Sequence, residues 1–146
     1  MNHTTYSFED LGGAIYHPLM APYQFTGEGV GSIEIRMTND RTAHDLAADG
    51  SIMVSKLPGN NGQISVNCQQ TSALHRWLLK LYNTLVSQSA DNWAIITIAM
   101  MNVTDGTSHM ATGVSFGKKA DKSYQAQGQR VTWTLWAIDI SEENFR

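Results

Sequence analysis

The sequence predicts a mainly β fold: an antiparallel β-barrel or sandwich with one flanking α-helix. Three observations support this prediction. Several short segments alternate between apolar and polar residues, a single long segment has helical spacing, and turn residues separate the segments. The chain has 146 residues, which is about the size of one domain. Since no repeat or linker divides the sequence, we expect a single domain over residues 1–146.

Period-two alternation predicts the first strands, at residues 32–38 (SIEIRMT) and 63–69 (QISVNCQ). The second segment divides into an inward apolar set and an outward polar set, Ile64, Val66 and Cys68 against Gln63, Ser65 and Asn67. Two other segments are predicted as loops. Residues 17–31 are rich in Pro and Gly, and residues 39–50 form a polar excursion between strands.

The stretch DGSIMVSKLPGNNGQISV (residues 49–66) places a lysine beside a glycine-rich turn, as a phosphate-binding loop would. A Walker loop, however, has the pattern G-x-x-x-x-G-K-S/T followed by a helix, because loop amides and the helix N-terminus bind the anion together. Here Lys56 precedes the glycines and a strand follows them. We interpret the stretch as a β-hairpin, with strands at 52–57 and 63–68 and a turn at 58–62.

A helix is predicted at about residues 71–87 (TSALHRWLLKLYNTLVS). Its apolar residues recur at steps of three and four and form one stripe, which comprises Leu74, Trp77, Leu78, Leu81, Tyr82 and Leu85. Thr71 or Ser72 is the expected N-cap. His75 is expected on the exposed or flanking side of the helix.

The remaining strands follow the helix. Residues 93–101 (WAIITIAMM) are apolar on both faces, which is typical of a central strand that is covered on both sides. Asp105-Gly106 predicts a hairpin turn into a strand at 109–117. Residues 130–140 are rich in β-branched and aromatic side chains and predict a long closing strand.

Composition and motifs argue against several kinds of activity. The formal net charge is −3, whereas nucleic-acid-binding domains usually carry a strong basic excess. The histidines have no metal-ligand spacing, Cys68 is the only cysteine, and there is no nucleophile elbow. The longest apolar run falls far short of the roughly 20 residues that cross a membrane. We expect no catalytic residue, cofactor or metal; the alternative is a small β-barrel binding module or enzyme with a pocket around His44, Asp45 or Glu34.

The order of these segments resembles a known family. The segments run from TYSFEDLGGAI through AADGSIM and the helix entry QTSALHRWLLKLYN to ATGVSFGKKADKSYQ and the closing aromatic strand. This order is similar to that of the tail tube proteins of contractile-tailed bacteriophages. The resemblance extends from about Thr5 to Ile140, and it is weakest over residues 17–31, to which no role is transferred.

The resemblance implies a structural role without catalysis. Subunits of such tubes form hexameric rings, and the rings stack into a channel inside a contractile sheath. It implies that the chain's partners are further copies of itself, the sheath protein, the tape-measure protein, and the baseplate and tail-terminator proteins. DNA would meet the tube only in transit, and the virion part would be assembled in the host bacterial cytoplasm. The alternative is the tube of a contractile bacteriocin or of a type VI secretion-like apparatus.

The resemblance also implies candidate contact residues. The excursion at 39–50 is similar to the extended loop that such subunits lay across the neighbouring ring. Candidates for ion pairs between rings or subunits are therefore Arg36, Arg41, Asp45 and Asp49. Candidates for lining the channel or meeting a neighbour are the uncharged residues Gln63, Ser65 and Asn67.

Overall fold

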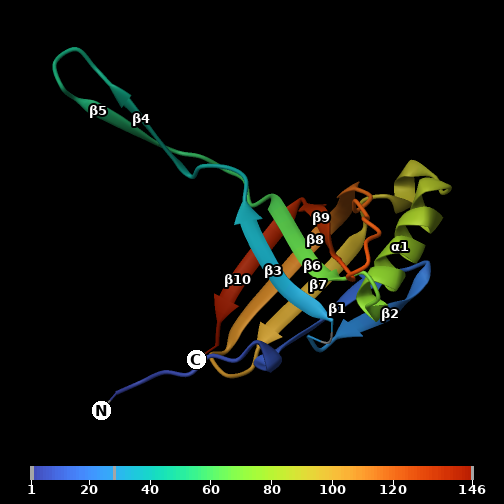
Figure 1. The fold of residues 1–146 in the computed structure, drawn as a ribbon. Coiled ribbons are helices and arrows are strands. Elements are labelled where there is room, and N and C mark those ends of the chain that lie inside the picture. The colour runs from blue at the N-terminus through green and yellow to red at the C-terminus, as the bar shows by residue number, and fades with distance from the viewer. Residues whose placement is uncertain (1, 28, 146) are drawn as a thin grey trace.

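The computed structural model describes residues 2–27 and 29–145 of the chain, with the side chain of Phe25 left out (Figure 1). Its strands are β1 (Leu11–His17), β2 (Met20–Phe25), β3 (Val30–Met37), β4 (Thr42–Leu46), β5 (Ile52–Lys56), β6 (Gly62–Gln69), β7 (Ile96–Asn102), β8 (Thr107–Lys118), β9 (Arg130–Ala137) and β10 (Asp139–Asn144). Its helical elements are α1 (Ala73–Val86) and the short 3-10 turns η1 (Phe8–Asp10) and η2 (Ala90–Asn92).

The predicted fold class, mainly β with one flanking helix, is confirmed. One 8-stranded sheet has the order β2-β1-β7-β8-β9-β6-β3, with β10 paired to β8, and all its neighbours are antiparallel. Within the described residues this sheet is open rather than closed into a barrel, because β2 and β3 end the order without pairing to each other. Strands β4 and β5 form a separate two-stranded hairpin.

Strand β8 changes partners along its length and so joins two halves of the sheet. One half contains β2, β1, β7 and β10, and the other contains β9, β6 and β3. Its first part pairs with β7 and β10, and its last part pairs with β9. Gly113 lies at the change with φ of +63°, and a Cβ there would stand 2.7 Å from Cδ1 of Ile138. Ile138 itself separates β9 from β10, so the strand predicted at 130–140 is two strands. Glycine therefore permits both the backbone turn and the close approach.

The hairpin predicted from residues 52–57 and 63–68 is wrong. Strand β6 pairs with β3 and β9, whereas β5 pairs with β4, which lies inside the segment predicted as a loop. Burial explains the difference. The inward set of β6 is 0–5% exposed and needs a place inside the sheet, while the side chains of Ile52, Met53 and Val54 are 55–63% exposed.

The segment predicted as a loop at residues 17–31 also contains a strand, β2. This strand lies at the edge of the sheet and pairs only with β1 among the described strands. Its Pro22 has no N–H to donate, and an edge strand tolerates such a residue because one side of its backbone is unpaired. The richness in Pro and Gly that suggested a loop therefore marks an edge strand and its flanking turns.

Helix α1 agrees with its prediction within two residues at each end. Ser72 is the N-cap, and its hydroxyl accepts a hydrogen bond from the His75 N–H at 3.2 Å. The stripe contributes four fully buried leucines, at positions 74, 78, 81 and 85, and the helix packs against β2 and β6. The leucines join one core cluster that draws on both halves of the sheet.

His75 is buried, not on the exposed or flanking side as predicted, because it forms a hydrogen bond with a side chain of the distant strand β9. Its side chain is 3% exposed, and Nε1–H of the fully buried Trp133 donates to its Nδ1 at 3.0 Å. The accepting Nδ1 is unprotonated, so the neutral ring carries its proton on Nε2, which has no hydrogen-bond partner among the described residues. Burial, followed by the positive charges of Lys122 and Arg76, lowers the pKa of His75.

This contact predicts that acid destabilises the fold. The pKa of His75 is lower in the folded than in the unfolded protein, so the unfolded chain binds more protons below about pH 6.5. The free energy of unfolding therefore decreases as the pH is lowered through this range. His75→Asn retains an oxygen that can accept from Trp133 but does not titrate. Urea unfolding between pH 7.5 and pH 5 should show a smaller loss of stability for this variant than for the wild type. Parallel losses would contradict the assignment.

The turn in β8 predicts a second effect. Gly113→Ala should lower the free energy of unfolding by roughly 1–3 kcal/mol, because an L residue is strained at this φ and its Cβ would clash with Ile138. Gly128→Ala is the matched control, since Gly128 lacks a positive φ and a Cβ added there would have no described atom within 4 Å. Urea unfolding followed by tryptophan fluorescence measures both, and equal effects would refute the role of Gly113.

Candidate assembly surfaces

The β4–β5 hairpin projects away from the sheet, as the ribbon shows (Figure 1). Its tip is held by local hydrogen bonds: the carboxylate of Asp49 accepts from the Ser51 N–H at 2.9 Å and from the Ser51 hydroxyl. Both hydrogen bonds lower the pKa of Asp49, and the bond from the Ser51 hydroxyl has the larger effect. Gly50 follows with φ of +91° and completes the turn. The hairpin is therefore a defined structure that stands out from the fold.

The two faces of this hairpin differ. Leu46 pairs with Ile52 and His44 pairs with Val54, which places all four side chains on one face; we call it the apolar hairpin face. Its three aliphatic side chains are 55–69% exposed. An isolated two-stranded hairpin is marginally stable in water. A projecting hairpin that exposes such a face is typical of a segment that binds another surface.

The residues predicted to form ion pairs lie at separate places. Arg36 is on β3, where it bonds to Glu34 of the same strand at 3.0 Å, and both side chains are exposed. Arg41 is at the root of the hairpin and donates to the carbonyl of Gly59 at 2.8 Å. Asp45 is exposed on β4, and Asp49 is at the tip. The structure does not bring the four together within one chain, and their contact with other subunits stays a prediction.

The outward set of β6 forms part of a continuous polar surface, which we call the polar sheet face. Gln63, Ser65 and Asn67 lie between residues of β3 and β9 in register, namely Ser32, Glu34, Arg36, Thr132, Thr134 and Trp136. Asn67 donates to the Thr132 hydroxyl at 3.1 Å and accepts from Arg130 at 3.4 Å. The face is rich in uncharged hydrogen-bonding groups.

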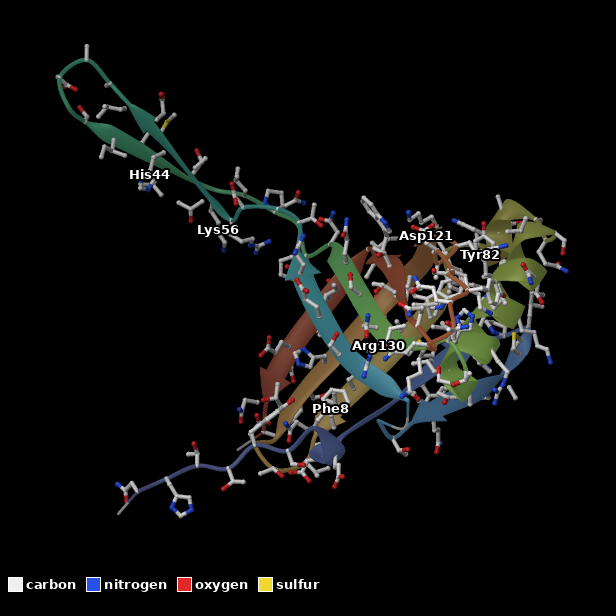
Figure 2. The ribbon with its side chains drawn as sticks, viewed as in Figure 1. Phe8, His44, Lys56, Tyr82, Asp121 and Arg130 are labelled. Carbon is white, nitrogen blue, oxygen red and sulfur yellow. The ribbon has the colours of Figure 1, made fainter. Side chains whose placement is uncertain are left out.

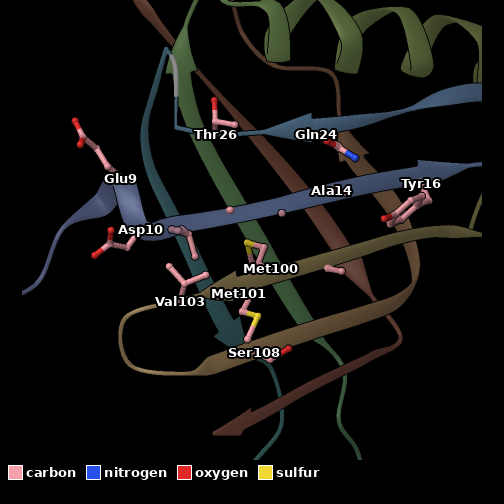
Figure 3. A pocket seen from close by; sticks show the side chains of 14 residues that line it. Glu9, Asp10, Ala14, Tyr16, Gln24, Thr26, Met100, Met101, Val103 and Ser108 are labelled. Carbon is pink, nitrogen blue, oxygen red and sulfur yellow. The ribbon is translucent and has the colours of Figure 1, made fainter. Parts of the chain in front are cut away.

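A groove lies on the outer side of β1 and β7, and sequence reasoning missed it (Figure 3). Small or apolar residues line its floor, among them Gly12, Ala14, Ala99 and Met101, and its volume is about 670 Å³. The signal was in the sequence, because residues 93–101 are apolar on both faces. One face of β7, with Ile96 and Ile98, is in the core, and the other forms this groove.

The structure separates the residues named for an alternative binding pocket. His44 and Asp45 are exposed on the projecting hairpin, where Figure 2 labels His44, while Glu34 is on β3. In the described part of the chain no group of three or more His, Cys, Asp or Glu side chains could hold a metal ion. No helix in that part is long and apolar enough to span a membrane.

A comparison with protein families decides between the remaining interpretations. The model of the family described as "Bacteriophage PhiTE tail tube protein" matches residues 3–144. The chain belongs to this tail tube family. The resemblance inferred from the order of segments is therefore confirmed, and the tail tube protein is a structural component of a phage tail. Among curated proteins, none matches its sequence significantly.

Solved structures with the same fold come from contractile injection systems. A chain from the anti-feeding prophage baseplate is 12% identical to the present chain, with a TM-score of 0.66; the match covers 100% of the present chain and 99% of the baseplate chain. A chain from the tube-terminating cap of the same particle is 8% identical, with a TM-score of 0.62 over 99% and 93%. A chain from the PVC sheath–tube complex is 10% identical, with a TM-score of 0.54 over 92% and 88%. At these identities the likeness shows the fold.

The contact of Arg41 predicts how the hairpin is anchored. Arg41→Ala removes the bond to the Gly59 carbonyl and should speed amide hydrogen exchange at the hairpin root, with a loss of about 0.5–1.5 kcal/mol in local stability. Arg36→Ala is the control, because its partner Glu34 is exposed on the same strand. Exchange at residues 57–61 that is unchanged in Arg41→Ala would contradict this anchoring role.

Proposed function

We propose that this tail tube protein, as one domain over residues 1–146, assembles into hexameric rings that stack into a tube inside a contractile sheath. The family match over residues 3–144 is the observation that carries the proposal. The tube forms around a tape-measure protein, is assembled in the host cytoplasm, and conducts the viral genome into the host. The role requires no catalytic residue, cofactor or metal.

The open sheet supports ring formation. Strands β2 and β3 end the order of the described strands, so each offers an unpaired backbone edge. An exposed edge readily pairs with a strand of another chain, and a closed ring of subunits removes every such edge. In a ring, the β3 side of one subunit adjoins its neighbour, and the polar sheet face continues from subunit to subunit.

The chemistry of the polar sheet face supports its position at the channel. Gln63, Ser65 and Asn67 present amides and a hydroxyl, which water solvates and which do not bind phosphates strongly. On β3, Glu34 neutralises Arg36 at 3.0 Å. Because each cation that binds a phosphate adds affinity for DNA, a lining with few free cations lets the genome pass without sticking. DNA is therefore a passenger, not a specific ligand.

The binding partners that we propose follow from the position of a tube between the baseplate and the terminator of a contractile tail. The similar solved chains come from a baseplate, a tube-terminating cap and a sheath–tube complex. We extend these partners to the tail tube protein as the baseplate, tail-terminator and sheath proteins. Arg41, Asp45 and Asp49 on the hairpin, together with Arg36, make the contacts between rings or subunits.

Electron microscopy of the purified protein tests assembly. We expect rings or tubes that grow with protein concentration and sediment on ultracentrifugation. A protein that stays monomeric at every concentration, with neither rings nor tubes in micrographs, would refute the proposal.

Size-selective labelling tests the channel position. Ser65→Cys, in a Cys68→Ala background, introduces a thiol on the polar sheet face. In assembled tubes a small maleimide should label Cys at this position through the channel, while a polymer-linked maleimide should label it far more slowly than in dissociated protein. Equal labelling by the polymer reagent in both states would place this face on the outside of the tube.

A further inference from the structure

The groove on β1 and β7 is shaped to receive an extended segment. Its floor consists of small or apolar residues from neighbouring strands, with Ala14 paired to Ala99 and Gly12 paired to Met101. Figure 3 shows Glu9 and Asp10 at one end of the groove and Tyr16 at the other. Small side chains leave room above the strands, and apolar ones favour an apolar occupant. The groove therefore suits a strand or hairpin that presents aliphatic side chains.

The apolar hairpin face matches the groove in length and character. Strand β4 has five residues, about 16 Å at roughly 3.3 Å per residue, and β1 has seven, so β4 fits within the length of β1. The hairpin offers Leu46, Ile52 and Val54 on this face, and all three are more than half exposed.

The charges of the two surfaces also match. Lys56 pairs with Thr42 at the root of the hairpin and shares the apolar face, followed by His44, whereas Asp45 is on the opposite face. The groove carries the carboxylates of Glu9 and Asp10 at one end. A hairpin laid with its root toward these carboxylates places opposite charges together and its aliphatic side chains over Ala14 and Ala99.

We propose that the groove is the docking site for the β4–β5 hairpin of a second copy of this chain, with Lys56 toward Glu9 and Asp10 and the tip toward Tyr16. The chain's own hairpin projects away from its sheet body (Figure 1), so the occupant comes from another copy. The docking rests on the proposed self-assembly and specifies which surfaces meet. It also gives β7 the cover on its second face that its sequence predicts.

Disulfide trapping tests the contact directly. In a Cys68→Ala background, one protein carries Val54→Cys on the apolar hairpin face and another carries Ala99→Cys in the groove. Mixed, assembled and oxidised, the two should form a heterodimeric cross-link. Met53→Cys is the matched control, because Met53 pairs with Asp45 on the opposite face of the hairpin and should cross-link to the groove far less.

Filling the groove tests its importance. No described heavy atom lies within 4 Å of a Cβ at Gly12, and its φ is not positive, so Gly12→Val should fold normally and yet occupy the groove. We expect loss of sedimenting assemblies with an unchanged circular dichroism spectrum and melting temperature. Gly128→Val, at an equally unobstructed site outside the groove, should assemble as the wild type does.

The outcomes separate the two proposals. If the wild type assembles but Gly12→Val also assembles, or if Met53→Cys cross-links as well as Val54→Cys, the docking proposal is wrong and self-assembly stands. If the groove thiol cross-links only to another groove thiol, the occupant is a second groove, which also overturns it. If the wild type never assembles, the proposed function fails and the docking inference falls with it.

Discussion

The change of partners along β8 is the constraint on which the rest of the structure depends. Because its first part pairs with β7 and β10 and its last part with β9, one strand belongs to both halves of the sheet. The halves then share one core with α1, and a single cluster contains Ile15 and Ile98 from one half and Ile64 and Trp133 from the other. Gly113 makes the junction possible, since a larger residue would be strained there and would meet Ile138.

Core packing explains why the outer surfaces are available for other contacts. The inward set of β6 and the leucines of α1 stabilise the chain's own core. The remaining outer surfaces differ in chemistry: the polar sheet face is rich in uncharged hydrogen-bonding groups, and the floor of the groove is small or apolar. Surfaces with few charges cost less to desolvate than charged ones. The low charged fraction of the chain, 16%, is consistent with a protein that buries much of its surface against copies of itself.

The sequence predicted elements better than their pairing. Alternation identified β3, β6 and β8, and helical spacing identified α1, because these patterns report which side chains face the core. The partner of a strand depends on the whole sheet, so the turn PGNNG suggested a hairpin between residues that belong to different sheets. Burial of His75 was also missed, since its partner Trp133 is 58 positions away along the chain. The apolar character of both faces of residues 93–101 indicated that a second apolar surface exists beside β7. The β1 residues that complete this surface as a groove are set by the β1–β7 register, which the sequence does not specify.

A tube made of such subunits would draw its strength from repetition. A single hairpin on a groove buries few aliphatic side chains, and an exposed ion pair contributes only about 0–1 kcal/mol. When each subunit both gives a hairpin and receives one, however, contacts form between surfaces that are already held together, and the effective concentration of each partner is high. Weak contacts then combine into a stable assembly that can still grow by adding one subunit at a time. In the proposed assembly, a neighbouring subunit would cover the aliphatic face of the projecting hairpin, which is more than half exposed in the single chain.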